Sequence, residues 1–335
     1  MEQSLRFPIR TWQNVSLGPL RIGIRSNEEQ FRELHYFPEN VRAANDAAVD
    51  YVVHCCNLKL DGPWSAQELD EARDRTYRGK RFAGGYYLTD HFGAPAYLAT
   101  AGKELWIFAE EFEGILWPFV VKLLLTYYAA DENYLHLKAA CVSLDGSGTL
   151  LVGRGGSGKT VLLARLCQSG AKFLTNTHAL IRDQTIEAMP TAMRVRNDPL
   201  FGAVITTGRL AAGIKPGEYL ADPQSDLQWQ TVDTARVRSI CLVDYRDAGR
   251  SVVRDMDPEE LFNYMEHFSL AVNIYGLRED VFDYMGADVE RLSDYWTDTK
   301  MKLKTLIRNS RRYYVSCDAM DDRQLASLRN LLVQN

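Results

Sequence analysis

Apolar side chains in the first 110 residues recur in short runs, several of which alternate with polar ones. Runs of this length and composition are typical of strands. The candidate strands are residues 15–24, 48–60, 80–90, 94–101 and 104–111. The polar stretch 65–80 begins with Ser65, a suitable N-cap, and predicts a surface helix or a long loop. Short connections between the strands favour a mainly antiparallel N-terminal module.

The middle of the chain predicts one buried helix followed by more strands. Residues 115–134 are almost continuously apolar and predict the helix. Residues 136–153 predict two strands around a turn at Asp145–Gly148, and further strands are expected at 172–176, 177–183 and 237–245. A turn is expected at Asp183–Gln184.

The last hundred residues have mostly helical periodicity, at 257–272, 277–309 and 321–334. Asp257 and Asp321 stand where helix N-caps would stand. The change of pattern predicts an α/β protein with two domains. Residues 1–130 would form the N-terminal α+β module, and residues 131–335 a nucleotide-binding domain with a helical C-terminal region.

Composition narrows the functional classes. The 335 residues carry a net charge of −5 without a long block of Lys and Arg, so a nucleic-acid partner has no electrostatic support. The longest apolar run, Gly114–Leu125, contains Pro118 and Lys122 and is too short to span a bilayer. The first residues lack the apolar core of a signal peptide, and the six cysteines have no disulfide spacing, so we expect a cytoplasmic protein with reduced thiols.

The stretch His54-Cys55-Cys56 raises the question of a metal site. Neighbouring residues on a strand point to opposite faces and cannot easily share one ion. A half-buried core strand is therefore the expected structure here.

The most informative stretch lies between a short apolar run, residues 149–152, and a segment with helical spacing that ends before Gly170. It fits the phosphate-loop pattern G-x-x-x-x-G-K-[ST] at every fixed position. Backbone N–H groups of such a loop surround a phosphate chain, helped by the partial positive charge of the helix N-terminus. Lys159 would reach the β- and γ-phosphates, and the Thr160 hydroxyl would bind Mg²⁺. The expected nucleotide-binding residues are Gly153, Arg154, Gly155, Gly156, Ser157, Gly158, Lys159 and Thr160.

Asp244 follows the apolar strand 237–243 and has two interpretations. It could be the second metal ligand beside Thr160, as the acid after an apolar strand is in many phosphate-loop proteins. The alternative, which the pattern favours, is a core strand that ends in a solvated Asp. No N-K-x-D motif is present, and nothing marks adenine or guanine.

Residues 135–196 resemble the HPr kinase/phosphorylase group, whose core is similar to that of phosphoenolpyruvate carboxykinase. The resemblance rests on Leu135-His136, a hairpin, the glycine loop, a helix, the segment Gly170–His178 and the segment Met189–Arg196. It implies an HPr kinase-like α/β core, ATP and Mg²⁺ as ligands, a homo-oligomer, and His136 at the edge of the active site.

The chain departs from this group at the acidic pair that binds Mg²⁺ and accepts the proton of the acceptor serine. Asn176 and Thr177 occupy those positions, and neither can be a general base near neutral pH. His178 is next to them and could serve instead. Asp183 and Glu187 are weaker substitutes because a hairpin would carry them away. Arg194 and Arg196 share one face of a strand and could hold a phosphate or an acidic acceptor, or face solvent.

Three functions remain open. One is an ATP-dependent kinase acting on a hydroxyl of a small protein, peptide or metabolite, with His136, His178 and Lys159 as catalytic residues. Another is activation of a carboxylate through an acyl phosphate, which needs no base. The third is a non-catalytic nucleotide-binding partner of another enzyme.

Overall fold

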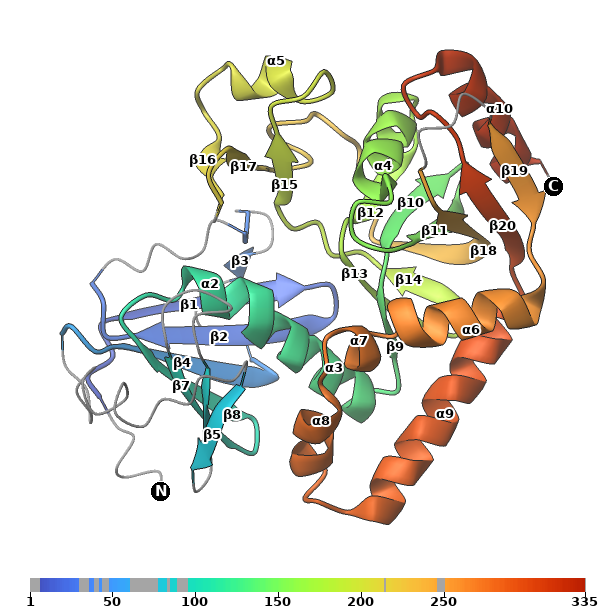
Figure 1. Cartoon of the computed structure of the whole chain (residues 1–335). Helices are drawn as coiled ribbons and strands as arrows, with labels where there is room; N and C mark the ends of the chain where they lie inside the picture. The colour runs from blue at the N-terminus through green and yellow to red at the C-terminus, as the bar shows by residue number, and fades with distance from the viewer. Residues whose placement is uncertain are drawn as a thin grey trace. The chain divides into compact units, whose positions relative to one another are not determined.

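The computed structural model describes residues 7–29, 36–38, 42–43, 48–60, 78–82, 85–88, 96–213, 215–245 and 251–334 (Figure 1). The chain forms two compact units, one of residues 1–124 with 211–220 and one of residues 125–210 with 221–335. Compactness alone does not show that a segment folds independently, so the domains 1–130 and 131–335 stay a prediction. The stretch 65–80 was expected as a helix or loop; residues 65–77 lie outside the described residues, and residues 78–80 belong to a strand.

The first unit contains a sheet of mixed direction. Its described strands, in the order β3-β1-β2-β4-β8-β7-β6-β5, are β1 (Thr11–Leu17), β2 (Leu20–Ser26), β3 (Arg42–Ala43), β4 (Tyr51–Asn57), β5 (Arg78–Phe82), β6 (Gly85–Leu88), β7 (Ala96–Ala101) and β8 (Glu104–Ala109). Neighbours pair antiparallel except β2–β4 and β4–β8, which are parallel. The prediction of a mainly antiparallel module is confirmed for these strands. The segment 15–24, expected as one strand, is a hairpin with Gly18-Pro19 between β1 and β2.

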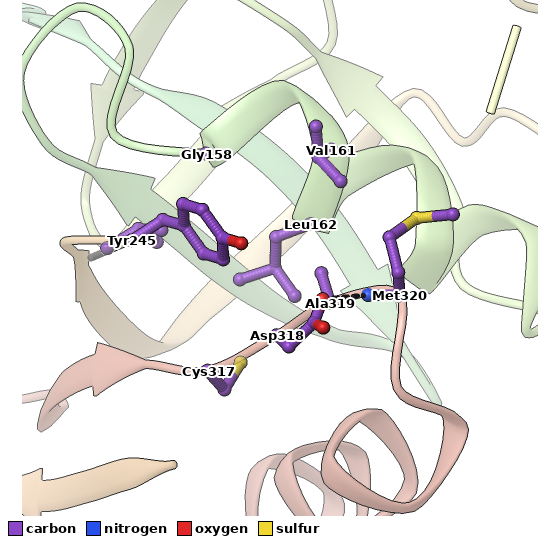
Figure 2. A pocket seen from close by; sticks show the side chains of 9 residues that line it. Gly158, Val161, Leu162, Tyr245, Cys317, Asp318, Ala319 and Met320 are labelled. Carbon is purple, nitrogen blue, oxygen red and sulfur yellow. Dashed lines mark hydrogen bonds between the residues drawn. The ribbon is translucent and has the colours of Figure 1, made fainter. Parts of the chain in front are cut away.

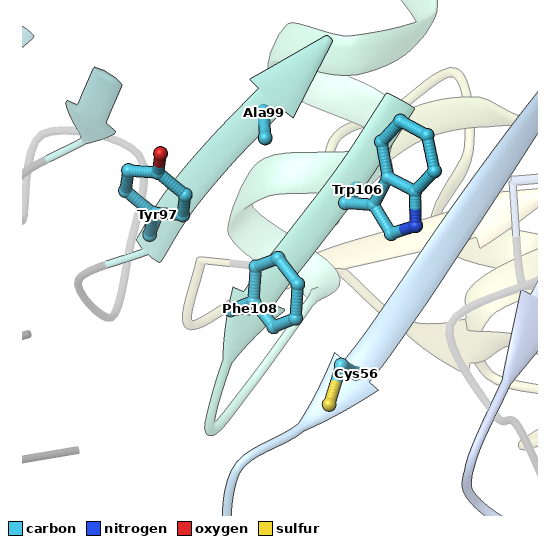
Figure 3. Close-up of a cluster of buried hydrophobic side chains, with 5 residues drawn as sticks. All are labelled: Cys56, Tyr97, Ala99, Trp106 and Phe108. Atoms are coloured by element: carbon cyan, nitrogen blue, oxygen red, sulfur yellow. The ribbon is translucent and has the colours of Figure 1, made fainter. Parts of the chain in front are cut away.

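One face of this sheet carries a buried cluster that follows the two-residue period of its strands (Figure 3). Cys56 of β4, Trp106 and Phe108 of β8, and Tyr97 and Ala99 of β7 belong to it. Phe108 is directly opposite Cys56 on one side and Tyr97 on the other, so the cluster crosses three neighbouring strands.

His54 lies on the same strand and takes part in this packing. Its ring stacks on Trp106 with centroids 5.0 Å apart, and its Nε2 is 2.9 Å from the Glu104 carboxylate. Cys55 and Cys56 are both buried. The three residues thus have the core-strand role expected from the sequence.

The apolar segment predicted as one helix is helical but irregular. It consists of α2 (Glu113–Ile115), the π-helical turn η4 (Leu116–Val121) and α3 (Lys122–Asp131). Pro118 lies inside the π-helical turn. Because proline has no backbone N–H, it removes one bond of the helical ladder, and the wider turn accommodates this loss.

The second unit is built on a sheet that brings parallel and antiparallel strands together. Its described strands are β9 (Leu135–Lys138), β10 (Ala140–Leu144), β11 (Ser147–Val152), β12 (Lys172–Thr175), β13 (His178–Arg182), β14 (Thr185–Glu187), β18 (Thr234–Val243), β19 (Val252–Asp255) and β20 (Arg311–Ser316). The long strand β18 pairs in parallel with β11 along one edge. Along the other edge it pairs first with β14 and then, in parallel, with β20.

Two predictions for this sheet need correction. Residues 136–153 form parts of three strands rather than two, because the chain changes partner at Ala139: β9 pairs with β13, whereas β10 pairs with β11 and β12. The C-terminal region is mostly helical, as predicted, but it also supplies β19 and β20, for which no strand was predicted. The segment 311–316 was missed because its side chains are mostly polar or aromatic and do not alternate.

The helices that follow β11 are α4 (Lys159–Gln168), α5 (Gly202–Ile205), α6 (Pro258–Phe268), α7 (Ala271–Ile274), α8 (Arg278–Tyr284), α9 (Val289–Arg308) and α10 (Asp322–Val333). The segment 257–272, predicted as one helix, is divided into α6 and α7, and the segment 277–309 is divided into α8 and α9 at a turn where Gly286 and Ala287 have φ +78° and +57°. The carboxylates of Asp257 and Asp321 accept backbone N–H bonds at the starts of α6 and α10, so both N-caps are confirmed. Gly170 has φ +95° and, with Ala171, returns hydrogen bonds to Cys167 and Leu166, which closes the C-terminus of α4.

Three short strands complete the list: β15 (Met193–Arg196), and β16 (Ala211–Ala212) paired antiparallel with β17 (Glu218–Ala221). The protein is therefore a mixed α/β structure with several sheets, as the sequence predicts at this coarse level.

Candidate functional site

The glycine loop Gly153–Thr160 connects the buried strand β11 to helix α4. Gly153 has φ +152°, and a Cβ there would come within 2.5 Å of both the Ser157 hydroxyl oxygen and the Val243 carbonyl oxygen. Gly158 is the N-cap of α4 with φ +89°, a conformation that side chains rarely adopt. The backbone thus turns sharply at both ends of the loop, and the N-terminus of α4 points into it.

Lys159 is folded over this loop. Its Nζ donates to the carbonyl oxygens of Gly153 at 2.8 Å and Arg154 at 2.7 Å, and to the Ser157 hydroxyl at 3.3 Å. Burial, assisted by the charge of Lys138, lowers the pKa of Lys159 to about 8. The three acceptors are neutral, so an anion in the loop would offer the ammonium group a stronger partner than it has here.

Thr160 is brought to Asn176, which follows β12. The Thr160 hydroxyl donates to Asn176 Oδ1 across 3.4 Å, a long bond. Both groups are neutral oxygen donors of the kind that Mg²⁺ accepts.

Asp244, expected as the second metal ligand, follows β18. In the sheet, β18 is on one side of β11, whereas β12, which leads to Asn176, is on the other side. Its carboxylate accepts a hydrogen bond of 3.0 Å from the hydroxyl of Tyr314 on β20. Because β11 and β18 are parallel, Asp244 and the glycine loop are at the same edge of the sheet. Throughout the residues that the structure describes, no group of three or more His, Cys, Asp or Glu side chains is placed to hold a metal ion.

His136 and His178 meet inside the unit. His136 Nε2 is 3.1 Å from His178 Nδ1, and His136 Nδ1 is 3.1 Å from the Thr126 hydroxyl. Tyr275 packs against both rings, with centroids 6.4 Å from His136 and 5.6 Å from His178. We call Thr126, His136, His178 and Tyr275 the histidine cluster.

The histidine cluster is buried, and its electrostatics follow from that. His136 is 4% exposed, and burial lowers its pKa to about 3. Burial also raises the pKa of Tyr275. Both side chains are therefore neutral near pH 7, and His136 is too weak a base there to take a proton from an acceptor.

Three cations adjoin this cluster and the glycine loop. Lys138 is opposite His178 in the β9–β13 pair, and its Nζ is 5.8 Å from the Tyr275 ring centre. Burial and the charge of Arg194 lower the pKa of Lys138, while the charge of Lys138 lowers that of Lys159. Lys159, Lys138 and Arg194 are thus close enough to repel one another, and we call them the cationic row.

The structure also locates the residues that the sequence considered as substitutes. Arg194 and Arg196 are both exposed on β15, on one face of the strand as predicted. Asp183 is in the turn of the β13–β14 hairpin, where Asp183 and Gln184 have φ +50° and +65°. Glu187 accepts a hydrogen bond of 3.3 Å from the Tyr134 hydroxyl.

Sequence reasoning missed Thr126, Lys138 and Tyr275. Thr126 lies in a segment that predicts helix, and Tyr275 lies between two such segments. Neither gives a chemical signal, since only the fold brings them to the two histidines. Lys138 is two residues from His136, and the alternation of side chains along a strand would have placed both on one face.

Every helix within the described residues is too short or too polar to cross a lipid bilayer.

Comparison with known proteins gives little support to any assignment. No family model matches the chain. No curated protein matches it in sequence. Among solved structures, the HPr(Ser) kinase/phosphatase from Coxiella burnetii aligns with 36% of this chain and 70% of its own, at 15% identity and a TM-score of 0.24. At this level of likeness nothing about the activity of the chain follows from the match.

Proposed function

We propose that the chain is an ATP-dependent phosphotransferase of the HPr kinase-like type, acting on a hydroxyl group of a small protein, peptide or metabolite. The observation that carries the proposal is the glycine loop itself. A buried strand, two glycines in conformations that other residues avoid, and a lysine held over the loop by neutral oxygens form a site suited to a polyphosphate.

The residues present fit a triphosphate with a magnesium ion. The loop N–H groups and Lys159 would hold the β- and γ-phosphates, and the oxygens of Thr160 and Asn176 would hold Mg²⁺, which neutralises charge on the phosphates when bound. Asp244 is kept as a more distant candidate ligand.

In the proposed reaction the acceptor hydroxyl oxygen attacks the γ-phosphorus while the bond from that phosphorus to the β–γ bridging oxygen breaks, and ADP leaves. The acceptor proton would pass to the imidazole of His178, since Asn176 and Thr177 cannot take it. Because His178 is only 3% exposed, this step requires the acceptor to reach a buried ring. His136, neutral and bonded to His178, would orient that ring. The cationic row would stabilise the charge on the transferring phosphoryl group.

Calorimetric titration with MgATP tests the proposal. Wild-type protein should bind, Lys159→Ala should lose at least tenfold in affinity, and Lys172→Ala, which removes an exposed lysine of β12, should bind like the wild type. Phosphate transfer to candidate acceptors should be lost in Lys159→Ala and kept in Lys172→Ala. Equal binding by all three proteins would overturn the proposal.

A second candidate is activation of a carboxylate, and the cationic row favours it. A carboxylate is already ionised at pH 7, so it needs no general base, and Lys138 with Arg194 would attract it. Its oxygen would attack the γ-phosphorus, ADP would leave, and an acyl phosphate would remain. Hydroxylamine converts an acyl phosphate to a hydroxamate. Hydroxamate formation that depends on ATP and an added acid, and that weakens in Lys138→Ala, would select this reaction over transfer to a hydroxyl.

A further inference from the structure

A cavity of about 210 Å³ opens beside the glycine loop, on the side of α4 that faces β18 and β20 (Figure 2). Gly158, Val161 and Leu162 of α4 form one wall. Tyr245, which follows β18, and the segment after β20 from Cys317 to Met320 form the others. All these walls belong to the second unit.

The cavity and the Thr160–Asn176 contact are on different sides of the first turn of α4. Residues at positions i, i+3 and i+4 share a helix face, as Gly158, Val161 and Leu162 do. Thr160 is about 200° around the helix from Leu162, at about 100° per residue. A ligand whose phosphates occupy the loop could therefore place its metal-binding end toward Asn176 and its other end in the cavity.

Tyr245 is attached to the glycine loop. Its backbone N–H donates to the Ser157 carbonyl oxygen at 3.0 Å, and its Cβ is 3.0 Å from where a Cβ on Gly158 would be. The Tyr245 side chain is 47% exposed. Met320, across the cavity, is 45% exposed. These two side chains offer flat or adaptable apolar surface to a ligand.

The cavity has one acidic side chain in its lining. Asp318 lines it, and its carboxylate accepts the Met320 N–H at 2.9 Å (Figure 2). The Asp318 N–H in turn donates to Gln324 Oε1 at 2.9 Å, which holds the segment in place. An aromatic platform with a carboxylate at its edge suits a flat heterocycle that carries an amino group.

We infer that this cavity receives the purine base of the nucleotide, stacked on Tyr245 with its exocyclic amino group toward Asp318. The inference rests on the proposed function, because only a triphosphate in the glycine loop would deliver a base to this position. It adds a base-binding site that no motif in the sequence marks.

Comparing two ligands separates the base from the phosphates. MgATP carries both, whereas magnesium tripolyphosphate carries only the phosphates. Tyr245→Ala should weaken MgATP binding about tenfold or more, since stacking of a base on an aromatic ring contributes that much, and should leave tripolyphosphate binding unchanged. Tyr245→Phe, which keeps the ring, should bind both ligands like the wild type. Phe268→Ala removes another exposed aromatic ring, on α6, and is the matched control.

Each outcome has one meaning. If Tyr245→Ala binds MgATP as tightly as the wild type, or weakens both ligands equally, the base site is wrong while the phosphate site stands. If wild-type protein binds neither ligand, the proposed function fails and the base site with it. Titration with GTP and CTP tests whether the site prefers a purine. In the wild type, GTP should bind about as tightly as ATP and CTP more weakly, whereas in Tyr245→Ala the affinities for CTP and ATP should be equal. Equal binding of CTP and ATP by the wild type would also overturn the inference.

Discussion

The glycine loop and the histidine cluster belong to the same unit but are built in different ways. The loop is one continuous segment whose shape depends on the backbone, with Gly153 and Gly158 at its turns and Lys159 as its main side chain. The cluster is made of side chains from α3, β9, β13 and the residue after α7, and Thr126, His136 and His178 in it are buried. The loop resembles a site ready for an anion. The cluster resembles a core in which His136 bonds to both His178 and Thr126.

This difference bears on which half of the proposed reaction is better supported. The nucleotide half needs N–H groups and a cation, and both are in place. The acceptor half needs a base, and the position of the acidic pair holds neutral Asn176 and Thr177. The adjacent His178 is bonded to His136 rather than to an acid. Substitutions in the glycine loop should therefore affect nucleotide binding, whereas substitutions near His178 should affect transfer to the acceptor.

The largest effect should come from the backbone of the loop. Gly153→Ala places a methyl group 2.5 Å from two oxygen atoms at a φ that alanine rarely adopts, so the variant should lose about 2–5 kcal/mol of stability and its nucleotide binding. Urea unfolding and calorimetry measure both. Gly155→Ala is the matched control, because a Cβ there meets nothing within 4 Å. If the two variants are equally stable, the backbone argument is wrong.

The sequence predicts more of the glycine loop than of the histidine cluster, because the loop is one continuous segment and the cluster comes from distant segments. The loop is local: the spacing of Gly153, Gly158 and Lys159, the strand before them and Gly170 after the helix are all visible along the chain. The structure has the strand, the turn and the helix where these residues predict them.

The histidine cluster could be predicted only in part. His136 and His178 were singled out separately, but no pattern indicates that their nitrogens are 3.1 Å apart, or that Thr126 and Tyr275 join them. Those contacts depend on the pairing of β9 with β13 and on where α3 and α7 pack. The break at Ala139 and strand β20 were missed because strand pairing is decided by partners distant in sequence.

The second effect concerns the pH dependence of stability. The pKa of His136 is about 3 in the folded protein and about 6.5 in an unfolded chain. The unfolded state therefore binds a proton first as the pH falls below 6.5, and stability is lost toward pH 3. The slope from this group is about 1.4 kcal/mol per pH unit. His136→Asn should show a shallower decline than the wild type between pH 6 and pH 4.

Thermal or urea unfolding across that range measures this slope. Carboxyl groups of the protein also titrate in this range and add to the slope. The test is therefore the difference in slope between the variant and the wild type. His267→Asn, which removes an exposed histidine of α6, should decline as steeply as the wild type. Parallel curves for all three proteins would show that the burial of His136 is not maintained in solution.

The third effect sharpens the nucleotide half. Lys159 has a pKa of about 8 without ligand, and a bound polyphosphate would raise it. Binding then requires the protonated lysine, so affinity is constant below pH 7 and falls as the pH rises above 8, by up to about tenfold per pH unit. Calorimetry in buffers with different ionisation enthalpies should detect proton uptake at pH 8.5.

Lys159→Arg keeps the charge without titrating in this range, and its affinity should depend less on pH. Lys138, whose pKa is also lowered, would account for a dependence that survives in that variant.

The smallest effect tests the boundary between the two halves. Asn176→Asp would place a carboxylate where the amide oxygen now lies, 3.4 Å from the Thr160 hydroxyl. Because an anionic oxygen binds Mg²⁺ better than a neutral one, the Mg²⁺ concentration needed for half-maximal ATP binding should fall a few-fold, about 1 kcal/mol.

Asn330→Asp, which adds the same charge at an exposed position of α10, should change nothing. Tighter Mg²⁺ binding without any gain in phosphate transfer would mean that proton removal by His178, rather than the missing metal ligand, limits the acceptor half. A gain in transfer would mean that Asn176 itself separates this chain from an efficient kinase. If Asn176→Asp leaves the Mg²⁺ requirement unchanged, the ion is not held at Thr160 and Asn176, and Asp244 becomes the candidate to examine.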